Sequence, residues 1–218
     1  MQIEVWSDVI CPWCYIGKRR LEMALAKFPH WESTEVIWRS FELDPDSPRQ
    51  LPGTLEEMLA QKYGVSPQEA AAMNAHVTAV AKEAGLEYHL ADARPGNTFD
   101  AHRLLHFAGS KQLGDGATEQ LMHAYFSESL PVGDHAALAR LAPEFGIAEN
   151  EALAMLKSDA YAKEVRADEE RAANLGITAV PFFVIDENLA ISGAQPVEVF
   201  SRALQQAWDN SQQDLSTT

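Results

Sequence analysis

Apolar positions recur with two different spacings along the chain, and these spacings divide it into three parts. Residues 2–10 and 34–43 carry short runs of β-branched and aromatic side chains, and each run predicts a buried strand. Between them, residues 12–28 place apolar side chains on one helical stripe that ends at Pro29. Residues 1–48 therefore predict a β-α-β unit.

A long helical stretch follows a break in this pattern. Residues 44–53 contain three prolines and a glycine, a composition typical of a loop at a domain boundary. Two capping boxes, Thr54 with Glu57 and Ser66 with Glu69, predict the first helix starts beyond it. Helical spacing then covers residues 98–110, 117–128, 134–145, 149–157 and 159–175.

Strand spacing returns only near the end of the chain. Residues 181–185 and 189–192 predict a hairpin, helical spacing follows Pro196, and residues 211–218 predict a loose tail. We therefore expect an α/β protein in which an all-helical insertion, residues 49–175, interrupts a sheet domain. Residues 1–48 and 176–210 would form that domain, with their strands meeting in one sheet.

Charge and composition narrow the range of partners. The chain has a net charge of -15, and its 46% hydrophobic content is ordinary for a soluble globular protein. An acidic chain of this kind is unsuited to nucleic acid or to an anionic membrane surface. The first residues show neither the basic nor the apolar region of a secretory signal, so we expect a reducing, cytoplasmic setting. Monomer and homodimer are both compatible with the sequence.

The two cysteines of the chain, Cys11 and Cys14, lie where the first strand pattern gives way to the first helix. A Cys-x-x-Cys pair at such a junction is typical of a redox site. Unpaired N–H groups and the positive end of the helix dipole favour the thiolate form of Cys11, which we expect to be exposed. Cys14, one turn along, could resolve a mixed disulfide formed at Cys11. A zinc half-site and an inert buried pair remain as alternatives.

Four stretches, in this order, resemble a known family. Cys-Pro-Trp-Cys at residues 11–14 and Val180-Pro181 resemble thioredoxin-fold proteins of the DsbA family. Asn97 to Arg103 and Ser192 to Pro196 resemble its FrnE-like cytoplasmic branch. The resemblance spans nearly the whole chain and implies a thioredoxin fold interrupted by an all-helical insertion domain.

The resemblance also implies a set of substrate-binding residues around the thiols. It implies a cis peptide bond at Pro181, packed against the cysteines, with the backbone of Val180 free to pair with an extended substrate segment. Pro12 and Trp13 lie within the motif, and Trp13 could contact substrate or simply pack. By resemblance, Asn97 and the residues after it face the thiols, although Asn97 is also a good helix N-cap.

Several residues in or near these stretches each allow two interpretations. Asp8 could accept a proton from Cys14 or cap a turn. His102 and His106, spaced four residues apart, could bind a metal or form an ordinary polar stripe. A proline at residue 181 could also be no more than the first residue of a strand.

Three functions are compatible with the sequence. We expect a thiol–disulfide oxidoreductase that acts on protein or small-molecule thiols and disulfides, without a bound cofactor or metal, and with glutathione as a conceivable co-substrate. The second is a glutathione-dependent transferase or isomerase of the kappa-class or chromene-carboxylate isomerase type, whose members have a serine where this chain has Cys11. The third is a non-enzymatic metal-binding or interaction protein.

Overall fold

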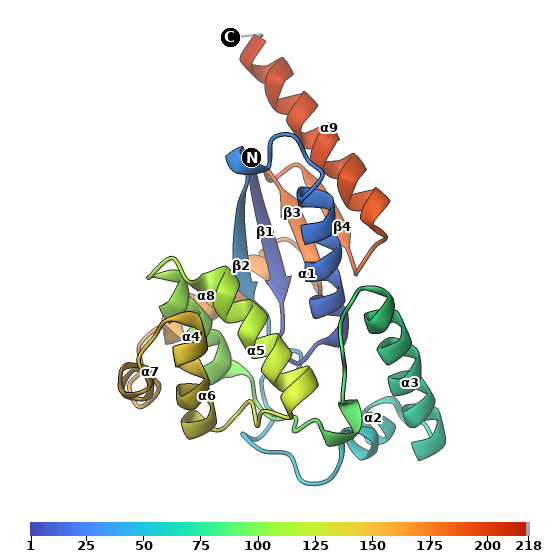
Figure 1. Cartoon of the computed structure of the whole chain (residues 1–218), viewed down its shortest axis with the longest axis vertical. Coiled ribbons are helices and arrows are strands. Elements are labelled where there is room, and N and C mark those ends of the chain that lie inside the picture. Colours follow the sequence, from blue (N-terminus) through green and yellow to red (C-terminus); the bar gives the residue numbers. More distant parts are fainter. Residues whose placement is uncertain (217–218) are drawn as a thin grey trace.

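The computed structural model describes residues 1–216, with side chains described through Gln213. Four strands form one sheet: β1 (Gln2–Ser7), β2 (Glu35–Ser40), β3 (Phe182–Ile185) and β4 (Leu189–Ser192), in the order β2-β1-β3-β4. β1 and β2 are parallel and are joined through helix α1 (Pro12–Leu25), as a parallel pair requires. β3 runs antiparallel to both β1 and β4. The predicted meeting of the two strand regions in one sheet is confirmed (Figure 1).

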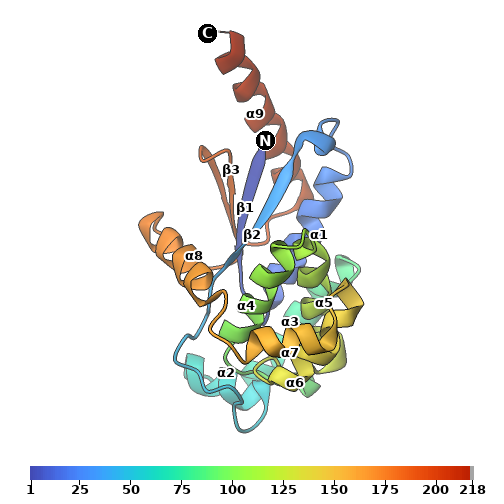
Figure 2. The same cartoon turned by 90° about the vertical axis from the view of Figure 1, so that its left-hand side faces the viewer.

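Alternate residues of β1 face opposite layers. Ile3 and Val5 belong to an apolar cluster with α1 and with the last helix, α9 (Val197–Ser216). Trp6 points to the other side, where Ala172 of α8 (Ala162–Asn174) packs on it. Figure 2 shows α8 on one side of the sheet and α1 on the other. The insertion expected from sequence, residues 49–175, includes α8. In the structure, α8 packs on the sheet.

The remaining helices gather beyond the carboxyl ends of β1 and β2 (Figure 1). They are α2 (Leu55–Tyr63), α3 (Pro67–Glu83), α4 (Phe99–Gly109), α5 (Gly114–Glu128), α6 (His135–Leu141) and α7 (Glu149–Leu156), with short 3-10 turns at Trp31–Ser33, Leu90–Asp92 and Ala142–Phe145. Both predicted capping boxes are present, at the starts of α2 and α3. Leu104, Leu121 and Phe126 of this region share one apolar cluster with Cys11 and Cys14. The thiol pair therefore lies where the helical region meets the sheet.

Several element ends differ from the sequence-based expectations. β1 ends at Ser7 rather than at residue 10, because the chain turns there and the Cys11 N–H donates to the Asp8 carbonyl at 3.1 Å. The loose tail expected from residue 211 is wrong as far as Ser216, since α9 continues to that residue. Ser211 donates its hydroxyl to the Trp208 carbonyl and so does not interrupt the helix. Residues 217 and 218, the rest of the expected tail, lie outside the described chain.

Candidate active site

Cys11 and Cys14 occupy the first turn of α1. Cys11 is the N-cap in extended conformation, Pro12 takes the first helical position, and the Cys14 N–H donates to the Cys11 carbonyl at 3.0 Å. Both thiols are free. The expectation that Cys11 is exposed is wrong: it is 4% exposed and Cys14 is 1% exposed. Cys11 belongs to the apolar cluster that Val180 packs against, and this packing shields its side chain from solvent.

The Val180-Pro181 segment meets the thiols from the far end of the sequence. The Cys11 thiol lies 3.6 Å from the Val180 carbonyl oxygen, and the Val180-Pro181 peptide bond is cis. The Pro181 carbonyl accepts from the Gly193 N–H at 2.8 Å. Gly17 permits close packing of α1 on this segment, because a Cβ there would lie 3.0 Å from Pro181 Cγ. The close approach therefore depends on the missing side chain of Gly17.

The Cys14 sulfur is held in its protonated form. Burial, followed by the hydrogen bond and charge of Cys11, raises the pKa of the Cys14 thiol well above its ordinary value. A backbone hydrogen bond from Asp8 opposes this rise, and the negative charge of Asp8, a smaller effect, adds to it. Cys14 must therefore lose its proton before it can react, and its surroundings disfavour that loss.

The other two motif residues differ in their contacts. The Pro12 carbonyl accepts a hydrogen bond of 2.8 Å from the Tyr88 hydroxyl, which links the motif to the segment after α3. Burial, followed by the nearby Cys11, raises the pKa of Tyr88, so its hydroxyl remains a donor at neutral pH. Trp13 is 37% exposed, and its ring lies 6.2 Å from the ring of His76 on α3. Trp13 thus offers an aromatic surface next to the thiols.

Asn97, which the resemblance places at the site, makes other contacts. Its side-chain amide donates to Glu42 at 3.0 Å and to the Pro45 carbonyl at 3.1 Å. Its side-chain oxygen accepts from the Phe99 N–H at 3.0 Å. The described contacts of Asn97 therefore fasten the start of α4 to the proline-rich segment, and none of them reaches a cysteine.

His102, from the same stretch, does reach the thiol loop. Its Nε2 lies 3.4 Å from Oδ1 of Asp8, and both residues are buried. The other carboxyl oxygen of Asp8 accepts from the Leu43 N–H at 2.8 Å, so it ties the thiol loop to the segment after β2, 35 residues along the chain, and is not the local turn cap considered from sequence. Spacing alone did not reveal the His102–Asp8 pair, because its partners are 94 residues apart and belong to different elements.

His106 does not share a ligand with His102. Its Nε2 lies 3.0 Å from the Ser40 hydroxyl and 3.1 Å from Asp168. Among residues 1–213, whose side chains are described, no group of three or more His, Cys, Asp or Glu side chains is arranged to hold a metal ion. Cys11 and Cys14 therefore lack the further ligands that a tetrahedral zinc site takes.

Comparison with known proteins identifies the family. Residues 2–205 match the model of the DSBA-like thioredoxin domain. The crystal structure of a probable DsbA oxidoreductase from Streptomyces coelicolor is 45% identical, with a TM-score of 0.92 over 96% of this chain and 90% of that one. YwbO of Bacillus subtilis (strain 168), an uncharacterized protein, is 29% identical over 206 residues, which is 94% of this chain and 96% of YwbO.

A more distant structure shares the fold alone. The cytosolic disulfide reductase DsbM from Pseudomonas aeruginosa, in a structure with GSH, is 14% identical, with a TM-score of 0.66 over 96% of this chain and 100% of that one. The family model and the 45% identical relative each cover most of the chain. The chain belongs to the family of DsbA-like thioredoxin-domain proteins.

Proposed function

We propose that this protein is a thiol–disulfide oxidoreductase in which Cys11 exchanges disulfides with its substrate and Cys14 resolves the intermediate. The observation that carries the proposal is the placement of Cys11 at a helix N-cap, 3.6 Å from the carbonyl of Val180. Cys11 stands at the positive end of the α1 dipole, where negative charge on an attacking group is stabilised. The backbone of Val180 offers a hydrogen-bonding edge on which an extended substrate segment can lie beside that sulfur.

The exchange balances without a bound cofactor. The Cys11 thiolate attacks a substrate disulfide, forms a mixed disulfide and releases one substrate thiolate. Cys14 then loses its proton, and its thiolate attacks the Cys11 sulfur. The Cys11–Cys14 disulfide forms as the second substrate thiolate leaves, so two electrons pass from the protein to the substrate. A dithiol or glutathione would reduce the pair again, and the reverse sequence would oxidise a substrate.

Protein and small-molecule disulfides are both suitable substrates for such a site. Trp13, 37% exposed beside the motif, provides an apolar contact for either kind. DsbM is described with GSH, and we propose glutathione as a small-thiol partner of this chain as well. The stretches Asn97 to Arg103 and Ser192 to Pro196 support placement in the FrnE-like branch.

A glutathione-dependent transferase or isomerase is the second candidate. That chemistry needs one activating group near residue 11 and no resolving thiol. The presence of Cys14 within one turn of Cys11, in the same apolar cluster, favours dithiol exchange instead.

Reduction of insulin disulfides with glutathione as electron donor tests the proposal. We expect the unmodified protein to be active and both Cys11→Ser and Cys14→Ser to lose turnover, because each removes one half of the dithiol. Glutathione conjugation to an aromatic halide is measured alongside. If Cys14→Ser keeps full activity in either assay, a mechanism that requires only residue 11 replaces the dithiol mechanism.

A further inference from the structure

A fully buried ion pair lies behind the thiol loop, and the proposed exchange steps do not use it. Asp8 is 0% exposed and His102 is 1% exposed. Their closest approach is 3.4 Å, and the Asp8 Oδ1 and both ring nitrogens of His102 have no hydrogen-bond partner. Buried polar atoms without partners are rare and costly, so charge attraction is the interaction that holds these two side chains together.

The surroundings favour a positive charge on His102. Burial alone would lower the pKa of His102, but Asp8, followed by Glu42 and Glu169, outweighs burial and raises it. These carboxylates come from the β1–α1 loop, the segment after β2, and α8. Of the three, Glu42 and Glu169 also bind Arg166, at 2.7 Å and 2.6 Å.

The other elements around α4 contribute no competing charge to the pair. α5 presents Tyr125, whose pKa is raised by burial and then by Asp8, so its ring stays neutral. α6 meets α4 through His135 and Asp100, at 2.6 Å, and α7 meets it through backbone carbonyls that accept from Arg103. Asp8 is therefore the partner in direct contact with His102.

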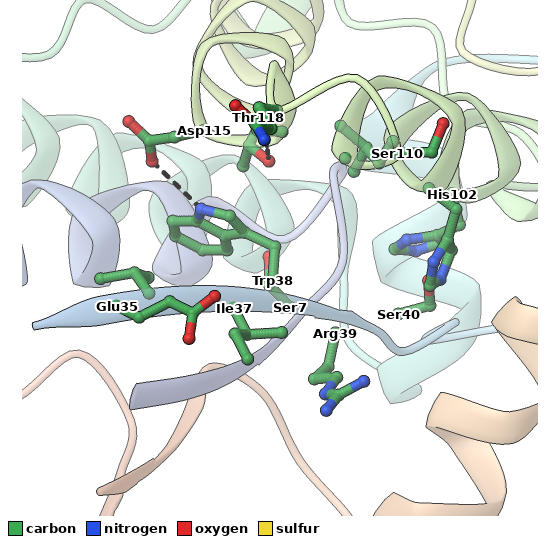
Figure 3. Close-up of a pocket in the computed structure, with 16 residues that line it drawn as sticks. Ser7, Glu35, Ile37, Trp38, Arg39, Ser40, His102, Ser110, Asp115 and Thr118 are labelled. Atoms are coloured by element: carbon green, nitrogen blue, oxygen red, sulfur yellow. Dashed lines mark hydrogen bonds between the residues drawn. The ribbon is translucent and has the colours of Figure 1, made fainter. Parts of the chain in front are cut away.

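A pocket connects His102 with the molecular surface. It has a volume of about 540 Å³ and lies between β2, α4 and α5. Figure 3 shows His102 and Ser40 at one end of this pocket. Trp38, whose indole N–H donates a hydrogen bond to Asp115, lies at the other end. His102 lines this pocket, although the residue is only 1% exposed.

The charge of Asp8 poses a difficulty for the proposed chemistry. Its carboxylate holds the thiol loop in place by accepting from the Leu43 N–H. Asp8 acts on Cys14 in two opposite ways: its backbone hydrogen bond lowers the pKa of the Cys14 thiol, and its negative charge, a smaller effect, raises that pKa and so disfavours the thiolate that must form before Cys14 can attack. A cation next to Asp8 would offset this repulsion while leaving the loop contact intact.

We propose that His102 is a positioning residue of the thiol site, a buried counter-charge that balances Asp8 so that the Cys14 thiolate can form next to it. The inference deepens the proposed dithiol function and rests on it. His102 acts through Asp8 and touches neither sulfur in the described contacts, so it is not a catalytic residue.

Titration of Cys14 as the sole thiol tests this proposal. In a Cys11→Ser background, the ultraviolet absorbance of the thiolate is followed between about pH 7 and 10, with a Cys11→Ser/Cys14→Ser chain as blank. At each pH at which His102 is protonated, we expect His102→Gln to lower the thiolate fraction, on the order of three- to tenfold, because the charge of Asp8 is no longer balanced. Asp8→Asn should raise the thiolate fraction, since it removes that charge.

A double variant and a matched control assign the effect to the pair. In the Asp8→Asn background, His102→Gln should change the thiolate fraction by less than about twofold, because the interaction is already absent. His106→Gln, one turn along the same helix, should leave the titration unchanged. An equal effect of His102→Gln with and without Asp8, or no effect at all, overturns the proposal.

A measurement on the unaltered chain covers the case in which a variant does not fold. The imidazole resonances of His102, followed by NMR against pH, should show a ring that stays protonated above the ordinary midpoint of about 6.5. A neutral ring at that pH overturns the proposal. Neither the thiolate titration nor the NMR titration requires disulfide exchange. Failure of the insulin assay would therefore overturn the proposed function without deciding whether His102 balances the charge of Asp8.

Discussion

Cys11 and Cys14 are both buried, yet different neighbours surround their sulfurs. Cys11 lies at the helix cap with the Val180 carbonyl as its partner. Cys14 lies a turn deeper, where burial first, followed by Cys11, raises the pKa of its thiol. This difference is the basis for the proposal that Cys11 attacks and Cys14 resolves.

Packing at Gly17 controls how closely Val180-Pro181 approaches the cysteines. In Gly17→Ala, the new methyl would lie 3.0 Å from Pro181 Cγ and 3.1 Å from Phe183 Cζ. Alanine normally stabilises a helix interior by up to about 1 kcal/mol relative to glycine. Neither the proline ring nor the buried phenyl group can rotate away, so we expect a net loss of about 1–2 kcal/mol in the free energy of unfolding. Urea denaturation measures it, and disulfide exchange should slow as well.

Gly116→Ala is the matched control for this substitution. A Cβ at Gly116, in α5, would meet nothing within 4 Å, so this variant should be neutral or slightly stabilised. Equal stabilisation of both variants would show that α1 and the Pro181 segment are not tightly packed.

At this scale the sequence was informative only where chemistry and local structure coincide. Cys11 and Cys14 could be recognised because a helix start and a thiol pair appear within a few residues. The role of His102 could not, because its partner Asp8 is brought close only by the packing of α4 against the thiol loop. Asn97 could be matched to a family pattern, but its contacts with Glu42 and Pro45 depend on how the proline-rich segment folds back.

Helix α1 is fixed to α5 by a cluster of charged side chains around the buried Lys18. Lys18 is 1% exposed, and its ammonium lies 2.9 Å from Glu119 and 3.5 Å from Asp115, with Glu22 as a third partner. Arg19 adds a contact of 2.6 Å to Glu119. Burial alone would lower the pKa of Lys18, but Glu22 and the other carboxylates outweigh it and raise the pKa. The helix that carries the thiols is thereby oriented by its polar face as well as by its apolar one.

Removal of this buried cation should be costly. We expect Lys18→Met to lower the free energy of unfolding by about 2 kcal/mol, because the half-buried Glu119 loses a charge-assisted bond and keeps only Arg19 as a cationic partner. Lys27→Met, at an exposed position just beyond α1, should change stability by less than about 0.5 kcal/mol. Denaturant unfolding of both variants at neutral pH provides the comparison. A loss below about 1 kcal/mol for Lys18→Met would mean that the cluster contributes little.

Elements with strong local signals were predictable, and elements defined by distant packing were not. The capping boxes at Thr54 and Ser66 have local side-chain signals, and both are present. The strand runs at the two chain ends could be recognised by their spacing, and they form one sheet. The position of α8 on the sheet depends on contacts such as the Trp6 indole donating to the Asp168 carbonyl, which the local sequence does not reveal.

For the molecule as a whole, partly buried carboxylates determine how stability depends on pH. Burial alone would raise the pKa of Asp100, but His135 and Arg103 outweigh it and lower the value. In the same way, Tyr15 and Lys18 outweigh burial at Glu119 and lower its pKa. A carboxyl with a lowered pKa in the folded state contributes stability above its unfolded value of about 4, and this stability is lost as the pH falls through the folded value.

We therefore expect the free energy of unfolding to fall steeply below about pH 4 and Asp100→Asn to flatten that fall. At neutral pH the same variant should lose about 3 kcal/mol, because the buried Arg103 keeps its bonds to backbone carbonyls but loses the carboxylate that balances its charge. Asp46→Asn, at an exposed carboxylate, is the control. Urea unfolding across pH measures both effects, and an unchanged acid limb in Asp100→Asn would contradict the expectation.

No helix of residues 1–216 is long and apolar enough to cross a membrane. The chain instead brings its two ends together at one sheet and holds the thiol pair between that sheet and the helical region. The central claim to be tested is that Cys11 and Cys14 have different roles in this site.

Capture of the mixed disulfide tests that claim most directly. Each single-cysteine variant is incubated with oxidised glutathione, quenched with acid and examined by mass spectrometry. We expect Cys14→Ser to accumulate a glutathione adduct on Cys11 that a reductant removes, because the attacking thiol remains and the resolving thiol is absent. Cys11→Ser should form little adduct on its buried, protonated Cys14. Adduct formation in Cys11→Ser but not in Cys14→Ser would contradict the assigned roles.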